Sequence, residues 1–344
     1  MKRIILIFII LAISANCIHA DQGRAGAQFL KIFPGVYGAS VGGASTILSN
    51  SSETVFWNPA GLNGIKKVSM FISHADYFAG IKYENFALTI PLNYGVLSVH
   101  GAGLLSGDIR ETTLEEPDGT GDFYSANDYA FGVAYGTQLT NKFALGINMN
   151  MLALSIDNLH AYGFTLDAGA KYFSGLPGNL TFGFTIKNFG PNISYSGEAL
   201  QDLKKKSENK FEKEDVKYEY IAEDFPLPLS FSFAVSGEIP ISDKQNIGIA
   251  LENWQILDLK EIYRLGVSWN YGDLFYISGG HANLKRLFNP DISAQKTNGS
   301  MQSWCFGGGV NLGMLFHKNF WIKYAWEAHE YFDGINRLGL DISF

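Results

Sequence analysis

The sequence predicts an all-β protein, an antiparallel transmembrane β-barrel of about 14 strands with an N-terminal plug in its lumen. Alternation, composition and loop length lead to this prediction. From about residue 68 onward, large apolar residues alternate with small or polar ones, as in Asn179–Lys187. Successive strand side chains point to opposite faces, so Leu180 and Phe182 share one face while Thr181 and Gly183 share the other. The second face carries few charges, which is typical of a barrel with lipid outside and a narrow lumen inside.

The composition agrees with a membrane barrel. Of 344 residues, 47% are hydrophobic and only 17% are charged. The sequence nevertheless contains no apolar run of the roughly 20 residues that a spanning helix needs. Backbone groups in lipid must find their hydrogen-bond partners within the protein, so we expect the strands to close into a barrel.

The first 20 residues have the features of a secretory signal peptide. Lys2-Arg3 supply the charged start, Ile4–Ala15 the apolar core and Ile18-His19-Ala20 a cleavage site. Lipidation at Cys17 is the alternative, and the residues before this cysteine do not favour it. We therefore expect a signal peptide over residues 1–20, a plug over 21–64 and a barrel over 65–344. Cleavage would leave a net charge of about −9, which argues against a nucleic-acid partner.

The expected strands follow one another at regular intervals along the chain. They cover roughly Val68–Ala75, Ile81–Ile90, Tyr94–Leu104, Asp128–Leu139, Phe143–Leu154, His160–Phe173, Leu180–Asn188, Leu229–Ile239, Gln245–Trp254, Glu261–Asn270, Leu274–Ala282, Gln302–Gly313, Asn319–His329 and Ile335–Phe344.

The connections between these strands predict the orientation of the barrel. The long connections Leu105–Asn127, Phe189–Pro228 and Asn283–Met301 all follow odd-numbered strands, and the joins after even-numbered strands are short. Bacterial barrels have short periplasmic turns and long extracellular loops. We therefore expect an outer-membrane protein, surrounded by outer-membrane lipids, with both termini in the periplasm. The last strand ends in Phe344, which resembles the signal that outer-membrane assembly machinery recognises.

The N-terminal part of the mature chain carries a family resemblance. The stretches Ala25–Ile32, Val41–Ala44 and Phe56–Leu62 resemble the opening of the PorV/PorQ family, a branch of the FadL-like outer-membrane barrels. The motif residues are Gly42, Gly43, Trp57, Asn58, Pro59 and Gly61. Further similarity follows in His74–Phe78, Lys82–Glu84, Glu115–Gly121, Asn188–Pro191 and Tyr195–Gly197, so that the resemblance covers nearly the whole mature chain.

The resemblance implies a 14-stranded barrel with an N-terminal plug. It also implies two possible functions. The best-understood PorV/PorQ members accept secreted cargo proteins from the type IX translocon, whereas the wider FadL group moves hydrophobic molecules through a lateral opening in the barrel wall. The charged stretch Gln201–Asp224 matches no family motif. We interpret the run Asp202–Asp224 as a short helix or mobile segment on the outer surface.

The sequence contains no convincing catalytic, metal or cofactor site. The glycines near residue 40 lack the spacing of a phosphate-binding loop, and the histidines of the mature chain lack metal-ligand spacing. His100 and Ser98 share one face of the third strand, but no third member of a catalytic triad is marked. We therefore expect a protein that is not an enzyme and that binds no metal or cofactor.

Charged residues at inward-facing positions are more informative. By alternation, they are Asp167, Lys171, Lys187, Glu252, Lys323, Glu327, Arg337 and Asp341. The last four lie on neighbouring strands and can pair, because buried charges need partners. We expect a charge network that fixes the plug, and the alternative is a polar translocation path.

Three functions are compatible with these observations. The first, which the long polar loops favour, is binding or shuttling of secreted cargo proteins in a type IX-like pathway, with the translocon as a further partner. The second is a channel for hydrophobic small molecules, for which Gly101 and Gly103 are the candidates for a kink that opens the wall. The third is a structural surface protein.

Overall fold

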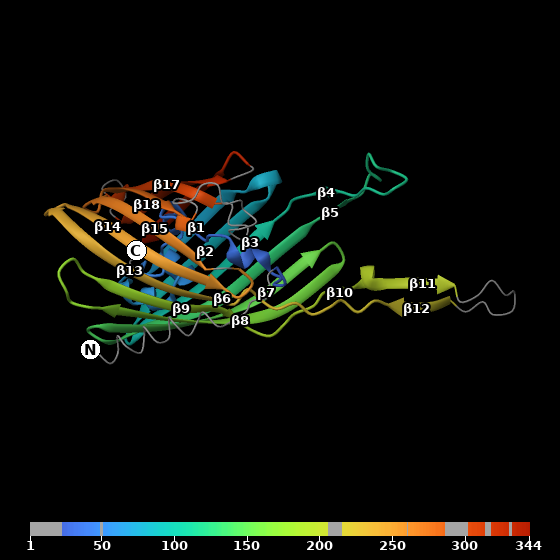
Figure 1. The fold of residues 1–344 in the computed structure, drawn as a ribbon, viewed down its shortest axis with the longest axis horizontal. Helices are drawn as coiled ribbons and strands as arrows, with labels where there is room; N and C mark the ends of the chain where they lie inside the picture. The colour runs from blue at the N-terminus through green and yellow to red at the C-terminus, as the bar shows by residue number, and fades with distance from the viewer. Residues whose placement is uncertain are drawn as a thin grey trace.

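The computed structural model describes residues 23–48, 51–205, 215–259, 261–285, 302–313, 318–329 and 332–344. It contains a closed antiparallel barrel of 14 strands (Figure 1). The barrel strands are β1 (Ser69–Asp76), β2 (Lys82–Leu92), β3 (Gly95–Leu105), β6 (Ala126–Thr140), β7 (Phe143–Ile156), β8 (Leu159–Phe173), β9 (Thr181–Phe189), β13 (Ser230–Ser242), β14 (Gln245–Ile256), β15 (Ile262–Tyr271), β16 (Phe275–His281), β17 (Gln302–Asn311), β18 (Asn319–His329) and β19 (Ile335–Ser343).

The predicted fold class is confirmed. Each expected strand range overlaps one barrel strand, in the expected order. The last strand pairs with the first, from Ser69 opposite Ser343 to Asp76 opposite Asn336, so the ladder has no free edge. No helix in the described ranges is long and apolar enough to cross a bilayer.

The two faces of the wall follow the alternation of the sequence. In β7, Ala144 and Leu152 are buried inside, whereas Ile147 and Met151 are about two-thirds exposed on the outside. In β9, an added Cβ at Gly183 would meet Thr46 and Ile47, which lie within the lumen. Phe182 packs on the other face against its cross-strand neighbours. The outer surface is therefore apolar and the inner surface is small and polar.

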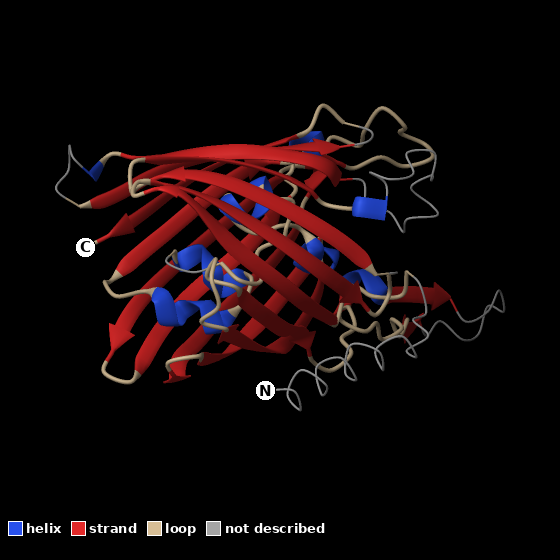
Figure 2. Cartoon of the chain, turned by 60° about the vertical axis from the view of Figure 1, so that its left-hand side comes forward, coloured by secondary structure: helices blue, strands red, loops and turns tan. Residues whose placement is uncertain are grey.

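A chain segment from Ala25 to Ile65 fills the lumen, and we call it the luminal segment. Its short helices are η2 (Gln28–Lys31), α2 (Tyr37–Ser40), η3 (Ser52–Phe56) and η4 (Pro59–Gly64), and they lie inside the cylinder of strands (Figure 2). Inward-facing glycines make room for it. A Cβ at Gly146 would lie 2.2 Å from the backbone carbon of Pro59, and a Cβ at Gly280 would lie 2.3 Å from that of Val41.

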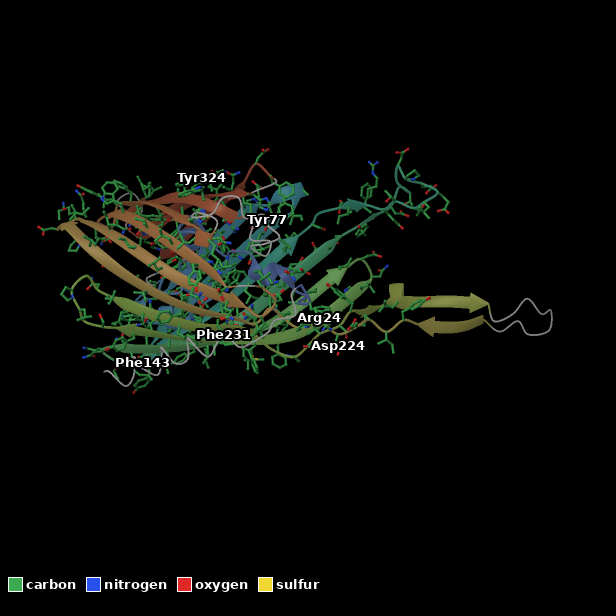
Figure 3. All side chains as sticks on the ribbon, in the orientation of Figure 1. Arg24, Tyr77, Phe143, Asp224, Phe231 and Tyr324 are labelled. Atoms are coloured by element: carbon green, nitrogen blue, oxygen red, sulfur yellow. The ribbon has the colours of Figure 1, made fainter. Side chains whose placement is uncertain are left out.

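The luminal segment begins at the end of the barrel that carries the long loops. Gly26 N donates to Pro226 O over 3.0 Å, and Arg24 lies 3.7 Å from Glu223. In Figure 3, Arg24 lies near Asp224, whereas Phe143 marks the end with the short turns. The segment then runs to that second end, where η4 contacts β6 and β7.

The described chain thus starts at the long-loop end, and the prediction that both termini lie at the short-turn end stays a prediction for the N-terminus, which precedes the described residues. The C-terminal strand does end at the short-turn end. The sequence argument assumed that the chain enters β1 directly from that side, but the luminal segment first crosses the barrel from the opposite end.

The long loops contain additional strands that the sequence did not predict. In the first loop, β4 (Ile109–Arg110) pairs with β5 (Phe123–Tyr124). In the second loop, β10 (Ser196–Gly197) pairs antiparallel with the end of β8 and is followed by the helix η6 (Glu198–Leu200). Next, β11 (Gln201–Lys205) pairs with β12 (Asp215–Glu219). Both hairpins project beyond the barrel (Figure 1). The helix alternative for Asp202–Asp224 is therefore wrong at its described ends, which pair as β-strands.

Candidate functional site

An ion pair within the barrel joins the wall to the luminal segment. The Nζ of Lys323, on β18, lies 2.9 Å from the Oδ2 of Asp341, on β19. The Oγ of Ser51 donates to the same Asp341 oxygen over 2.5 Å and lies 3.2 Å from the Lys323 nitrogen. All three side chains are buried. A buried ion pair needs additional hydrogen bonds to satisfy its remaining atoms, and the luminal segment supplies them here.

Glu53 is a second buried acid beside this pair, and the sequence analysis missed it. Its carboxylate lies 3.8 Å from Lys323 and accepts hydrogen bonds from the backbone N–H groups of Gly38 (2.8 Å) and Tyr37 (3.2 Å). Burial raises the pKa of this carboxyl group, and the positive charge of Lys323 opposes that shift. Glu53 thus holds η3 and α2 together. Its only sequence signal is an acid within a stretch rich in Gly, Ala and Ser.

The other two charges of the expected four form a separate pair. The Nε of Arg337 donates to Glu327, and both side chains are buried. Within the described residues, no hydrogen bond or ion pair links this pair to Lys323 and Asp341. The structure therefore brings the four residues together as two pairs, and only the pair with Lys323 binds the luminal segment directly.

A further anchor of the luminal segment lies on β14 and β15. Arg264 pairs with Glu252 at 3.4 Å and donates to the carbonyl oxygen of Gly43. Glu252 in turn accepts from Thr46 N over 3.0 Å. Arg264 was not among the expected inward charges, although it lies opposite Glu252 in the ladder.

The N-terminal motif residues serve the internal packing of the luminal segment. Asn58 donates to Thr46 O over 2.7 Å and accepts from Ala60 N, so it caps η4, which Pro59 begins. Trp57 packs against a neighbouring phenylalanine ring with centroids 5.8 Å apart.

The three glycines of the motif are required by close approaches and backbone conformation. A Cβ at Gly61 would lie 2.4 Å from Leu48 O, and a Cβ at Gly42 would lie 2.8 Å from His281 N. Gly42 and Gly43 also have positive φ angles of 66° and 77°, which side chains rarely tolerate.

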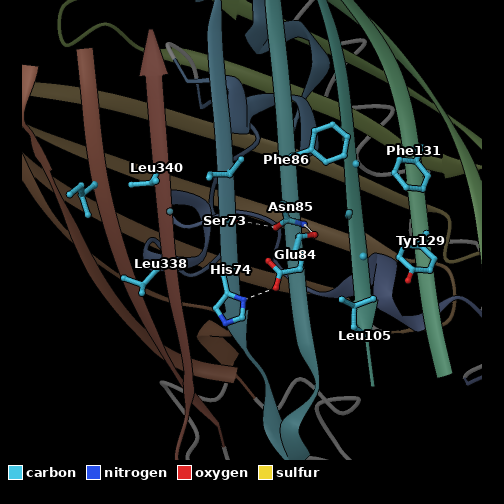
Figure 4. A pocket seen from close by; sticks show the side chains of 16 residues that line it. Ser73, His74, Glu84, Asn85, Phe86, Leu105, Tyr129, Phe131, Leu338 and Leu340 are labelled. Carbon is cyan, nitrogen blue, oxygen red and sulfur yellow. Dashed lines mark hydrogen bonds and ion pairs between the residues drawn. The ribbon is translucent and has the colours of Figure 1, made fainter. Parts of the chain in front are cut away.

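A groove of about 640 Å³ lies on the outer face of the wall. Its floor includes Gly101 and Gly103, which face outward from β3. The rings of Phe86 and Phe131 flank it (Figure 4). Its lining is mostly apolar; the polar residues are Ser73, Asn85 and, toward the long loops, His74, which lies 2.6 Å from Glu84.

The two glycines that are the candidates for a kink lie in a ladder of regular register. The β3 ladder runs without a register shift from Gly95 to Leu105 against β2, and without one against β6. Gly101 and Gly103 leave the ladder intact, and the missing side chains create a depression in the outer face.

A small cavity lies on the inner side of the same part of the wall. It has a volume of about 50 Å³ and lies between the luminal segment and residues of β2, β3, β6, β7, β8 and β9. Ala102 of β3 lines both the cavity and the outer groove. The two spaces are thus separated by a single layer of backbone.

Comparisons with known proteins place the fold. No family model and no curated protein matches the sequence. The toluene transporter TodX of Pseudomonas putida superimposes with a TM-score of 0.52 at 10% identity, covering 89% of this chain and 95% of that one. The monoaromatic hydrocarbon channel CymD gives 0.52 at 10% identity, covering 90% and 97%. The toluene transporter TbuX of Ralstonia pickettii gives 0.51 at 9% identity, covering 90% and 96%.

These similarities concern the fold, because the sequence identities are low. They agree with the closed outer-membrane barrel architecture that the resemblance implied. They do not extend to the PorV/PorQ family, which stays a prediction from the motif residues.

Proposed function

We propose that this chain is a non-catalytic outer-membrane barrel that passes small hydrophobic molecules across the outer membrane. One observation carries the proposal: the apolar outer groove and the inner cavity lie on opposite faces of the wall at Ala102. The solved structures of the same fold that are described as toluene transporters and monoaromatic hydrocarbon channels support it.

The packing of the lumen favours a route through the wall. Buried side chains of the luminal segment, among them Phe33, Val36 and Leu62, pack against the inner surface of the barrel, so a straight aqueous path would require the segment to leave. A lateral route needs only a local separation of β3 from its neighbour. Gly101 and Gly103 place no side chain on the outer face there, so an apolar molecule would reach the backbone layer once the neighbouring rings that cover these glycines turn aside.

Substitutions in the groove test this route. Gly101→Val and Gly103→Val fill the depression and should reduce uptake of labelled toluene into proteoliposomes several-fold. A Cβ at Gly101 meets ring atoms of Phe86 at 2.5 Å and Phe131 at 3.0 Å, and these rings can turn into the groove. Ala168→Val, at an exposed outward position on β8, is the matched control. Heat-resistant migration of the folded barrel checks assembly of each variant. Unchanged uptake in both glycine variants would refute the lateral route.

A second candidate function rests on the loops. The β4–β5 and β11–β12 hairpins project from one end of the barrel, well beyond the wall (Figure 1). Such projections offer exposed polar surface for a protein partner. They favour binding of secreted cargo proteins, and a type IX translocon would be the corresponding second partner.

A further inference from the structure

A chain of hydrogen bonds on the inner wall begins at Asp167 of β8. Its Oδ2 accepts from Asn148 Nδ2 over 2.8 Å and from Asn150 Nδ2 over 3.3 Å, and its Oδ1 accepts from Asn188 N over 2.7 Å. An ionised carboxylate only accepts hydrogen bonds. It therefore fixes the orientation of both amide groups, with each NH₂ turned toward Asp167.

The same logic fixes the state of His100 on β3. The Oδ1 of Asn150 lies 3.0 Å from His100 Nε2 and also accepts from Asn148 Nδ2 at 3.2 Å. Because this amide oxygen can only accept, Nε2 carries the proton. In a neutral imidazole the other nitrogen, Nδ1, is then an acceptor.

Two acceptors at the cavity are consequently left without a donor. Neither Asn148 Oδ1 nor His100 Nδ1 has a hydrogen-bond partner among the described residues. The two residues are 4% and 3% exposed, and both line the 50 Å³ cavity. Buried acceptors without partners are costly, so the site is complementary to a group that donates hydrogen bonds.

The other side of the cavity is apolar. It is formed by Leu30, Ile32 and Pro34 of the luminal segment, together with Phe56 and Ala130. A volume of about 50 Å³ accommodates one or two water molecules or a hydroxyl group with its first carbon. A larger apolar body would have to displace Leu30 and Ile32, which are only half-buried and belong to a short helix and its end.

We propose that this cavity recognises the hydroxyl group of small apolar alcohols and phenols, with His100 Nδ1, beside Asn148 Oδ1, accepting its single O–H proton. This inference rests on the proposed transport function and names its substrate class. A hydrocarbon leaves both acceptors without a donor. A carboxylate brings only acceptors to the same atoms, and Lys187, the cation among the lining residues, already donates to Phe56 O over 2.6 Å. The site therefore selects phenol over its methyl ether, anisole, and over benzoate.

Histidine ¹⁵N NMR on the full-length barrel in detergent tests the proposal. Phenol should shift the Nδ1 resonance of His100, because this nitrogen gains a hydrogen bond, and should bind roughly tenfold more tightly than anisole. His100→Leu should abolish this preference. His100→Gln retains one donor and one acceptor and should preserve part of it, and its spectrum assigns the resonance. Ser98→Ala is the matched control, since Ser98 is a buried inward residue of β3 that does not line the cavity.

The outcomes separate this inference from the proposed function. Equal binding of phenol and anisole would refute hydroxyl recognition. A His100 resonance that phenol leaves unchanged would refute it as well. Both results are expected if the cavity holds water only. If toluene uptake persists under those results, the transport function stands alone. If His100→Leu fails to assemble, the resonance in the unaltered protein and the response of His100→Gln still decide the question.

Discussion

The Nζ of Lys323 and the Oδ2 of Asp341 lie 2.9 Å apart in the interior of the barrel, and Ser51 of the luminal segment contacts both. Adjacent strands and the luminal segment therefore share one buried polar cluster. Glu53 joins the same cluster. The wall and the segment are thus expected to unfold together.

Removing one partner of this ion pair should destabilise the barrel. Asp341→Ala leaves Lys323 with only Glu53 and Ser51, and we expect a loss of about 3–5 kcal/mol in the free energy of unfolding, measured by urea titration in detergent. The double variant Lys323→Met/Asp341→Leu removes both charges and should lose clearly less. Equal losses in the single and double variants would show that the charges themselves are unimportant.

Deleting residues 21–43 should leave a folded barrel that conducts ions more readily. The strand ladder closes without this segment, from β1 to β19, and the deletion opens the lumen. Arg264 loses the Gly43 carbonyl, so thermal stability should fall as well. Single-channel conductance in planar bilayers is the measurement, and a truncated barrel with unchanged conductance would contradict an occluding role for the segment.

The outward position of Phe182 predicts sensitivity to charge. Phe182→Arg should cost roughly 2–4 kcal/mol if the residue lies near the bilayer midplane, and it should impair assembly. Spin labels at positions 180, 182 and 184 should report lipid, whereas labels at 181 and 185 should report the lumen. The reverse pattern would invert the assignment of the two faces.

Replacing Gln201–Asp224 with a short Gly/Ser linker separates the two candidate functions. The segment includes the β11–β12 hairpin and the Glu223 partner of Arg24, and it lies outside the barrel ladder. Heat-resistant migration and toluene uptake should therefore stay unchanged. Pull-downs with secreted proteins would weaken only if the loops bind cargo. Loss of uptake after this replacement would contradict the lateral wall route.

The sequence predicted the barrel well because strand alternation is a local property. The outward Phe182 and the inward Gly183 can be assigned from a few neighbouring residues. The inward charges follow from the same period, and so does the pairing of neighbouring strands, which placed Lys323 close to Asp341. The alternation of short and long connections likewise showed which end of the barrel carries the loops.

Only the tertiary structure decided the interior and the two wall sites. Lys31 contacts Asp258 across 227 positions of sequence, and no local pattern reveals that the chain enters the lumen from the long-loop end. Gly101 was a candidate for a kink from the sequence, whereas the groove that it lines on the outer face is visible only in the structure. Asn148 Oδ1 and His100 Nδ1 lack a donor because Asp167, on a neighbouring strand, orients the amide groups of Asn148 and Asn150. Alternation sets which face a side chain occupies, whereas the partner it meets there is set by three-dimensional packing.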